Sequence, residues 1–432
     1  MPFETGRRAP RRVAVIGGGI SGMGAAHALS SDHRVVLFEA EKRFGGHART
    51  IMAGRRGNQP VDTGFIVFNK VNYPNLTGLF ESLEIEIAPS SMSFGASIAG
   101  GRLEYALNNL NALFAQRRNF VRPAFLRMVR DILRFNAGAR AALSGRDMTI
   151  GELIGELGLG AWFRDYYLAP FSGAIWSTPT RGILEFPAEA MVRFFENHAL
   201  MSTHGQHQWW TVRGGSRIYV DRLTARLADR GVDLRAGASV KGVRRTSLGI
   251  EVRCADGDWE GFDEVVFATH SDDTLALLQD ANGVERTALS AVRYQPNEAV
   301  LHADDSVMPK RRACWASWVY TEEDEARPDR IGLSYWMNSL QPIPMDDPLF
   351  VTLNPTRPLR DELIHDVATF RHPVYDSAAL AAQLTIRAIN GQNNTWYCGA
   401  WMKNGFHEDG LASALDVADG IRATRMHEAA AA

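Results

Sequence analysis

The chain has 432 residues, of which 45% are hydrophobic and 39 are glycine, so it is long enough to bury more than one sizeable core. Its formal net charge of −2 gives no reason to expect a nucleic-acid partner, and no uninterrupted apolar run is long enough to span a bilayer. The first residues carry no apolar secretory signal, and the three cysteines lie far apart without metal-ligand spacing. We therefore predict a two-domain cytoplasmic protein with reduced thiols and no metal site.

The first predicted unit is a strand, a turn and a helix over residues 13–26, VAVIGGGISGMGAA. Gly17, Gly19 and Gly22 have the spacing G-x-G-x-x-G. The first permits a tight turn, the second lets the backbone approach a pyrophosphate, and the third lets the helix pack on its strand. A second predicted strand ends at Glu39, whose carboxylate would bind a free ribose hydroxyl. This order predicts a dinucleotide-binding site.

The sequence EKRFGGHART follows the second strand and adds a further glycine turn. Gly45 and Gly46 again allow a close backbone approach, and Arg43, His47 and Arg49 supply donors for the same pyrophosphate. Two interpretations of His47 stay open at this point. Its ring either faces the phosphates or donates to a nearby carbonyl group.

These motifs, together with the DTGF element at 62–65 and the segment WYCGAWMKNGFHEDGLASALDVADGI at 396–421, resemble the flavin-containing amine oxidoreductase superfamily. That superfamily includes monoamine oxidases, protoporphyrinogen oxidase and phytoene-type desaturases. The resemblance implies an α/β fold with an α+β insert, in which a discontinuous Rossmann-like FAD-binding domain holds an inserted substrate domain. It also implies that residues 405–410 lie along the flavin ring at a helix N-terminus, where developing negative charge is stabilised, and that Val240 lies near the adenine.

By this resemblance, the FAD-binding domain comprises residues 1–75, 205–285 and 390–432, and the substrate-binding domain comprises 76–204 and 286–389. The predicted cofactor-binding residues are Gly17, Gly19, Ile20, Ser21, Gly22, Glu39, Ala40, Arg43, Gly45, Gly46, His47, Asp62, Gly64, Phe65, Val240, Gly399, Gly405, Phe406, His407, Asp409 and Gly410. Some relatives attach the flavin through a cysteine near the C-terminus. Because Cys398 reads as a buried strand residue, we expect non-covalent FAD here.

The chain departs from the superfamily at two positions. Arginine usually occupies the place of His47, so a permanent charge is replaced by a group that titrates. Many amine oxidases also place a lysine beside flavin N5, on a strand that corresponds to residues 296–303, PNEAVLHA. No lysine occurs in that stretch, and the nearest one, Lys310, lies in a predicted turn.

Four stretches carry a narrower resemblance, to bacterial predicted NAD/FAD-binding proteins that include a fatty-acyl desaturase of furan fatty acid synthesis. They cover residues 62–80, 105–119, 294–320 and 405–414. The resemblance implies a lipid or fatty acyl substrate. It also implies a functional link to lipid methyltransferases related to cyclopropane fatty acyl synthase.

The segment from Arg117 to Arg140 is strongly basic, with seven arginines and the single acid Asp131. A helix that opens at Pro123 would place arginines on one face and apolar residues, among them Phe125 and Phe135, on another. Such a helix either lies on the anionic inner face of a membrane or packs on its own domain with its arginines in water. The residues leave both alternatives open.

Aromatic residues concentrate in the inserted segments and could line an apolar tunnel, although core packing must account for most of them. They are Phe171, Trp176, Trp209, Trp210, Trp315, Trp318, Tyr320, Tyr335 and Trp336. His204 is the predicted catalytic group, and His207 and His302 are further polar candidates, each also explained as a structural histidine. We predict an FAD-dependent oxidoreductase, a desaturase that removes hydrogen from an unsaturated or methyl-branched acyl chain on a phospholipid, with hydride transfer to flavin N5. The alternatives are a soluble flavin amine or carotenoid-type oxidase and a non-catalytic flavin-binding partner of a lipid methyltransferase.

Overall fold

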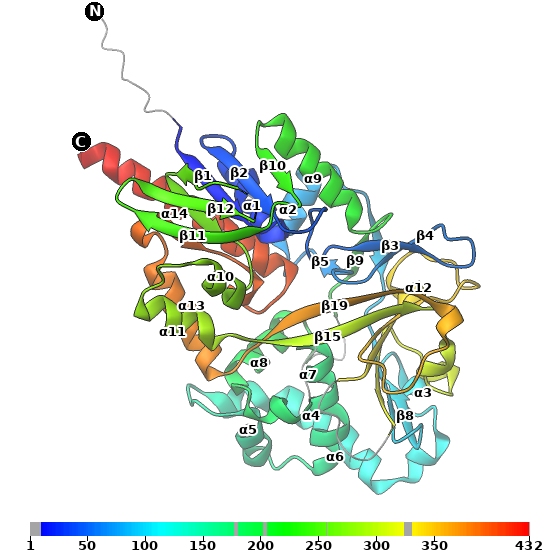
Figure 1. Cartoon of the computed structure of the whole chain (residues 1–432). Coiled ribbons are helices and arrows are strands. Elements are labelled where there is room, and N and C mark those ends of the chain that lie inside the picture. Colours follow the sequence, from blue (N-terminus) through cyan, green and yellow to red (C-terminus); the bar gives the residue numbers. More distant parts are fainter. Residues whose placement is uncertain (1–9, 177–179, 202–204, 256, 324–330, 432) are drawn as a thin grey trace, which may run out of the picture.

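The computed structural model describes residues 10–176, 180–201, 205–255, 257–323 and 331–431 (Figure 1). Within them, a parallel sheet of five strands is assembled from three distant parts of the chain. The strands, in spatial order, are β10 (Asp233–Ala236), β2 (Arg34–Glu39), β1 (Arg12–Ile16), β14 (Glu264–Phe267) and β20 (Thr395–Tyr397). The central strands β1 and β14 read as almost continuous apolar runs because both faces of the sheet are covered.

Helices cover one face of this sheet and a mixed layer covers the other. The first face packs α1 (Ile20–Leu29), α2 (Pro74–Ser82), α9 (Arg217–Asp229) and α14 (His407–Ala431) into one apolar core. The second face packs α10 (Ser271–Leu277), α11 (Gly283–Ala291), α13 (Ser377–Ile389) and a small antiparallel sheet of β11 (Val240–Thr246), β12 (Gly249–Cys254) and β13 (Glu260–Phe262). This three-layer arrangement is the α/β fold that the glycine fingerprint predicts.

A second region is built on a sheet of seven described strands. Their spatial order is β19 (Ile364–Val374), β15 (Arg293–His302), β18 (Phe350–Leu353), β17 (Leu333–Trp336), β16 (Trp318–Glu322), β7 (Phe94–Ile98) and β8 (Leu103–Ala106). Helices from the first inserted segment pack against it, and Figure 1 shows most of them gathered at the end of the molecule away from the parallel sheet. They are α4 (Pro123–Leu143), α5 (Ile150–Glu156), α6 (Ala161–Phe163), α7 (Ala169–Trp176) and α8 (Ala188–Asn197).

Small elements join the two regions. They are β3 (Thr50–Ala53) paired with β4 (Gln59–Asp62), the sheet β5 (Phe68–Asn69), β9 (Trp209–Val212) and β6 (Ile87–Ser90), and the short helices α3 (Leu110–Leu113) and α12 (Met337–Leu340). The described three-ten or π turns are Arg117–Val121, Arg164–Leu168, Thr180–Glu185, Asp305–Val307, Arg312–Cys314, Asp361–Leu363, Gln392–Asn394 and Ala400–Met402.

Packing does not follow the predicted domain boundaries closely. The boundary between residues 75 and 76 lies inside α2, whose Leu76, Leu79 and Phe80 belong to the same core as α1 and α14. Helix α13, placed by the sequence in the substrate segment 286–389, packs in the core beneath the parallel sheet. Side-chain patterns at a boundary do not reveal which of two neighbouring cores a helix joins.

Helix α4 begins at Pro123, as its sequence predicts, and its main apolar face is buried within its own region. Phe125, Met128 and Phe135 are each 0% exposed. A membrane therefore cannot bind that face. This burial is what we expect from the alternative in which the helix packs on its own domain. The exposed side keeps Leu126 and Leu133 beside the arginines.

Candidate functional site

A cavity of about 1190 Å³ lies where the carboxyl ends of β1, β2, β14 and β20 face the second region. Its walls come from the β1–α1 turn, from residues 39–49 and 268–273, from strand β19, and from the segment 399–407. The edge at the carboxyl ends of parallel strands is where open α/β sheets bind ligands. The volume exceeds the range of about 300–1,000 Å³ typical of a single small-ligand site, so it can hold a cofactor and a second molecule.

Glycine is needed at each of the three fingerprint positions for a different structural reason. Gly17 has φ of +108°, and a Cβ there would lie 2.8 Å from the Ala268 carbonyl oxygen. A Cβ on Gly22 would lie only 1.7 Å from the Gly17 carbonyl oxygen. Gly19 is different, because a Cβ there meets no protein atom closer than Gly46 Cα at 4.0 Å. Gly17 and Gly22 thus serve the turn, whereas Gly19 leaves the cavity side of the turn open.

The second glycine turn is fastened to the first. The Gly45 N–H donates to the Gly18 carbonyl oxygen at 2.8 Å, and the Gly18 N–H donates to Glu39 Oε2 at 2.6 Å. Arg43 donates to the carbonyl oxygens of Gly46 and Ala48, so it braces this turn while lining the cavity. The carboxylate of Glu39 therefore stands at the end of β2 between both turns.

These features fit an FAD molecule. Helix α1 begins beside the cavity without a side-chain cap and without an acid in its first turn, so its N-terminal N–H groups are available to an anion. Gly19 supplies the open backbone surface that a pyrophosphate needs, and Glu39 supplies an acceptor for a ribose. Together they provide the donors and acceptor that a dinucleotide requires.

The C-terminal segment brings a second helix start to the same cavity. Gly405, Phe406 and His407 line it, and α14 begins at His407. Asp409 accepts hydrogen bonds from the N–H groups of Phe406 and Asn404, which fixes the entry into the helix. A Cβ on Gly410 would lie 2.8 Å from Ser21 Oγ, so the first turns of α14 and α1 pack closely.

Fifteen of the 21 predicted cofactor residues line the cavity. They are Gly17, Gly19, Ile20, Ser21, Glu39, Arg43, Gly45, Gly46, His47, Gly64, Phe65, Gly399, Gly405, Phe406 and His407. The other six lie behind the wall or outside it. Gly22 and Gly410 allow close helix packing, and Asp409 caps a helix. Val240 of β11 is buried in a hydrophobic core, and Ala40 is exposed.

Asp62, the remaining one of these six, is 0% exposed and holds three elements together. Its carboxylate accepts from Thr50 Oγ1 at 2.6 Å, from the Ser216 N–H at 2.8 Å and hydroxyl at 2.7 Å, and from Gln341 Nε2 at 2.9 Å. Burial raises the pKa of Asp62 to about 6, although these hydrogen bonds oppose the rise. The structure thus gives this acid a bracing position behind the cavity wall.

The predicted histidines occupy different places. His204 lies outside the described residues. His207 is partly exposed, with its Nε2 3.1 Å from the Asn197 carbonyl oxygen. His302 is 0% exposed and pairs with Thr352, as a structural histidine would. Sequence reasoning missed His198, His270 and His372, which do line the cavity, because the helix end, the turn and the strand that carry them have no local motif.

Besides His198, which stacks on Phe194, four histidines line the cavity: His47, His270, His372 and His407. The ring centroids of His270 and His372 lie 6.0 and 5.9 Å from that of His47. Burial lowers the pKa of His47 to about 4, and that of each of the other three to about 3. These rings are therefore neutral at pH 7, and His47 does not replace the permanent charge of an arginine. The sequence also allowed a hydrogen bond from this ring to a carbonyl oxygen. Among the described residues, the His47 ring makes no such bond.

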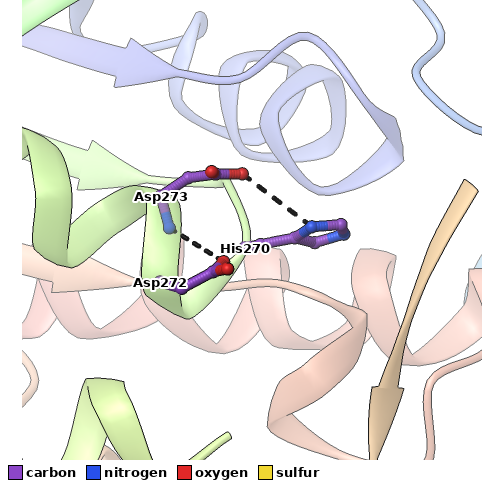
Figure 2. A group of neighbouring side chains, drawn as sticks. All are labelled: His270, Asp272 and Asp273. Carbon is purple, nitrogen blue, oxygen red and sulfur yellow. Dashed lines mark hydrogen bonds and ion pairs between the residues drawn. The ribbon is translucent and has the colours of Figure 1, made fainter. Parts of the chain in front are cut away.

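Figure 2 shows His270 beside Asp272 and Asp273, three groups whose ligand atoms lie within 4.8 Å of one another. Arg371 of β19 reaches all three. Its guanidinium donates to Asp272 at 2.7 Å, contacts Asp273, and lies 3.1 Å from His270 Nδ1. The cation that this cluster accommodates is therefore a guanidinium, which joins β19 to the start of α10.

The part of the cavity toward the second region is apolar and aromatic. Of the nine aromatic residues that the sequence singles out, Phe171, Trp176, Trp209, Trp318 and Tyr335 line it, and Trp210, Trp315, Tyr320 and Trp336 do not. Phe94, Tyr167, Ile175 and Phe194 also line this chamber. No lysine lines the cavity within the described residues, and β15, the strand that corresponds to 296–303, contains none. The chamber thus offers apolar surface rather than charge.

The parallel sheet, its glycine turns and the apolar chamber together define a dinucleotide-dependent oxidoreductase as the class of protein. Residues 20–303 match the family described as flavin containing amine oxidoreductase. The chain belongs to that family, and its fold is the amine oxidase-like FAD-binding fold that the sequence predicts. A search among curated proteins finds no match.

Solved structures with the same fold have varied activities. One is the CLA-producing fatty acid isomerase from P. acnes, with TM-score 0.69, 15% identity, and coverage of 94% of this chain and 97% of that one. A putative protoporphyrinogen oxidase from Exiguobacterium has TM-score 0.70, 16% identity and coverage of 96% and 99%. The cyclohexylamine oxidase from Brevibacterium oxydans has TM-score 0.65, 15% identity and coverage of 96% and 100%. At these identities the likeness establishes the fold alone.

No helix among the described residues combines the length and hydropathy needed to cross a bilayer.

The buried histidines predict that the protein loses stability as the pH falls. A histidine in the unfolded chain titrates near 6.5, so between pH 6.5 and about 4 the unfolded state binds more protons than the folded state. Burial also lowers the pKa of His27, His198 and His302 to about 4. Asp62 and Asp409 act in the opposite direction, because burial raises the pKa of each to about 6, but they are two groups against seven histidines. We expect a loss of at least about 5 kcal/mol between pH 7 and pH 5, measured by chemical denaturation.

A matched pair of variants tests whether the buried histidines cause this loss of stability. His372→Gln should make stability depend less on pH, because burial lowers the pKa of His372 to about 3. His365→Gln, at an exposed position on the same strand, should leave it unchanged. Stability that rises on acidification from pH 7 to pH 5 would contradict the assignment.

Proposed function

We propose that this protein is an FAD-dependent oxidoreductase, of the fatty acyl desaturase type, which removes hydrogen from an unsaturated or methyl-branched acyl chain on a phospholipid. The apolar aromatic chamber beside the dinucleotide site carries this proposal. FAD, when bound, would supply a hydride acceptor at N5, and loss of one hydride to the flavin and one proton to water would leave a new double bond in the chain. A double bond already in the chain weakens the adjacent C–H bonds, which suits hydride removal.

The protein's own residues bind, orient and exclude water. The Gly19 turn, the α1 N-terminus and Glu39 would hold the pyrophosphate and ribose of FAD non-covalently. The start of α14 at His407 would face the flavin ring and stabilise negative charge there. Phe171, Trp176 and the other chamber residues would hold an acyl chain in a dry environment.

The chamber opens near the surface beside an apolar segment. Leu107 lines the cavity and is 37% exposed, so it marks a mouth that an acyl chain can enter. A fatty acid isomerase among the solved structures with this fold is in keeping with a chain-shaped substrate. We propose on the strength of this exposed apolar segment that the cytoplasmic protein lies on the inner face of a membrane, and we propose separately that a lipid methyltransferase is the enzyme that supplies the branched chain.

Anaerobic flavin reduction tests the proposal. Purified protein is mixed in turn with phospholipids that bear unsaturated or methyl-branched chains, with amines and with carotenoids, and absorbance of the flavin bands is followed. We expect bleaching by lipid alone, with loss of two hydrogens from the chain by mass spectrometry. Bleaching by amines or carotenoids alone would favour the soluble oxidase alternative. Bleaching by none of them would favour a non-catalytic flavin-binding partner.

A chamber variant separates binding of substrate from binding of cofactor. Ile175→Trp should fill the chamber and slow bleaching by lipid by about tenfold or more, while flavin content stays unchanged. Leu248→Trp, at a position 97% exposed, adds the same side chain elsewhere and should have no effect. Equal rates in the two variants would mean that the acyl chain does not occupy this chamber.

The flavin should leave the protein when the fold is destroyed. Cys398 is 0% exposed and does not line the cavity, and burial raises the pKa of its thiol to about 12, so it forms little thiolate. We therefore expect acid precipitation to release all flavin into the supernatant, measured by its absorbance. Yellow colour retained in the pellet of wild type but not of Cys398→Ser would instead demonstrate a covalent link.

A further inference from the structure

A second pocket, separate from the flavin cavity, is strongly basic. It has a volume of about 500 Å³ and is formed by the β7–β8 turn, the three-ten turn at Arg117–Val121 and the segment before Arg312. Five cationic residues line it, together with Gly100, Gly101 and Gln116: Arg102, Arg117, Arg118, Lys310 and Arg311. These residues come from three separate turns, of which the one with Lys310 and Arg311 is distant in sequence from the other two, so the fold itself gathers the charge.

Little negative charge offsets these cations. Glu104 is 0% exposed and accepts from Arg311 at 2.8 Å and from the Lys310 N–H at 2.7 Å. Glu323, near Gly100, pairs with Arg357 at 3.1 Å. Such an excess of guanidinium and ammonium groups in a concave site favours a phosphate.

The scaffold of the pocket holds the cationic groups in place. Lys310 Nζ donates to the Gly100 carbonyl oxygen at 3.0 Å, Arg117 donates to Asn111 at 2.6 Å, and Arg118 donates to the Arg102 carbonyl oxygen. Each of these groups has further N–H donors than these bonds use. The lining is thus organised before a ligand arrives, and its remaining donors can face the pocket.

Gln116 adds an acceptor to this set of donors. It is 2% exposed, and its Nε2 donates to the Gly101 carbonyl oxygen at 3.0 Å. Its Oε1 is buried without a partner among the described residues. A buried acceptor without a donor is costly, so a ligand with a hydroxyl group next to its phosphate suits the pocket better than phosphate alone.

Exposed apolar side chains adjoin the pocket. Of the fourteen large hydrophobic residues exposed in the described part of the chain, six lie between positions 107 and 133: Leu107, Leu110, Phe120, Val121, Leu126 and Leu133. Phe120 and Val121 are 52% and 81% exposed and belong to the same turn as Arg117 and Arg118. Apolar residues beside a basic site are what an anionic membrane surface binds.

The pocket also lies at a useful distance from the cavity mouth. Strand β8 runs from the pocket, at Arg102, to the mouth, at Leu107. Five residues of extended chain span about 16 Å. A lipid whose headgroup occupies the pocket could therefore direct an acyl chain toward the mouth.

We propose that the pocket of Arg102, Arg117, Arg118, Lys310 and Arg311 binds the phosphate and hydroxyl groups of an anionic phospholipid headgroup, with Phe120 and Val121 entering the apolar layer of the membrane. This inference deepens the proposed lipid oxidation and rests on it for the identity of the substrate. The binding itself is measured without any turnover.

Vesicle sedimentation with the flavin-loaded protein tests the headgroup site. Wild type should bind phosphatidylglycerol vesicles and bind phosphatidylcholine vesicles at least about tenfold more weakly. Arg117→Gln/Arg118→Gln should lose about tenfold or more in affinity for phosphatidylglycerol. Arg55→Gln/Arg56→Gln removes the same charge from another exposed turn and should bind as wild type does. Equal binding by the two double variants would overturn the proposal.

Two further arms identify the source of the phosphate. Val121→Ser should weaken binding to phosphatidylglycerol vesicles, whereas Leu248→Ser should not. Inorganic phosphate that abolishes vesicle binding at millimolar concentration, with Val121→Ser unaffected, would mean a site for soluble phosphate and would overturn the lipid assignment. Flavin reduction by detergent-dispersed lipid should be slower in Arg117→Gln/Arg118→Gln than in wild type, and unchanged in Arg55→Gln/Arg56→Gln. If no lipid reduces the flavin but this variant still loses vesicle binding, the proposed reaction fails and the headgroup site stands.

Discussion

Gly19→Ala should yield a folded protein that binds FAD at least about tenfold more weakly than wild type, which corresponds to about 1.4 kcal/mol of binding free energy. Gly19 has φ of −76°, which alanine adopts freely, and a new Cβ would meet no protein atom closer than 4.0 Å. The methyl group would instead occupy the open side of the turn, where the pyrophosphate must approach the backbone. The measurement is titration of the apoprotein with FAD, with the thermal midpoint of the apoprotein as the test of folding.

Two other glycine variants separate access from folding. Gly22→Ala should lose both flavin and stability, because its Cβ would lie 1.7 Å from the Gly17 carbonyl oxygen. Gly155→Ala, in helix α5 with nothing within 4 Å of the new Cβ, should change neither. If Gly19→Ala bound FAD as tightly as wild type does, the pyrophosphate would not lie against this turn.

Asp62→Ala should destabilise the protein by about 3–5 kcal/mol, although Asp62 does not line the cavity. The substitution leaves the Thr50 hydroxyl, the Ser216 N–H and hydroxyl, and the Gln341 amide without their shared acceptor in a site that is 0% exposed. Each buried donor left without a partner costs about 1–3 kcal/mol before the structure relaxes. Chemical denaturation of wild type and variant measures the difference.

The comparison variants for Asp62 test the role of the carboxylate. Asp62→Asn keeps one acceptor oxygen for Thr50 and Ser216 and should cost less than Asp62→Ala, about 1–2 kcal/mol. Asp229→Ala, at an exposed position on α9, should change stability by less than about 0.5 kcal/mol. Unchanged stability in Asp62→Ala, accompanied by loss of flavin, would instead make Asp62 a cofactor ligand.

The helix at 123–143 shows what the spacing of apolar residues can and cannot predict. The spacing of its apolar residues predicts an amphipathic helix that opens at Pro123, and the structure has that helix. Periodicity cannot say what covers the apolar face, because a membrane and a neighbouring helix both bury the same side chains. The fold places Phe125, Met128 and Phe135 in the protein core and leaves Phe120 and Val121, which lie outside the repeat, on the surface.

The sequence by itself determined the dinucleotide fingerprint, because the conformations that Gly17 and Gly22 permit are set within a few residues of chain. Motif resemblance extended this to the fold and to the family, including the return of residues 399–407 to the same cavity. Only the tertiary structure decided the position of Asp62, whose partners Thr50, Ser216 and Gln341 are distant in sequence. The same holds for the basic pocket, where Arg102 and Lys310 come together from separate turns. Local backbone preference is encoded in neighbouring residues, whereas the surroundings of a side chain depend on which distant segments pack against it.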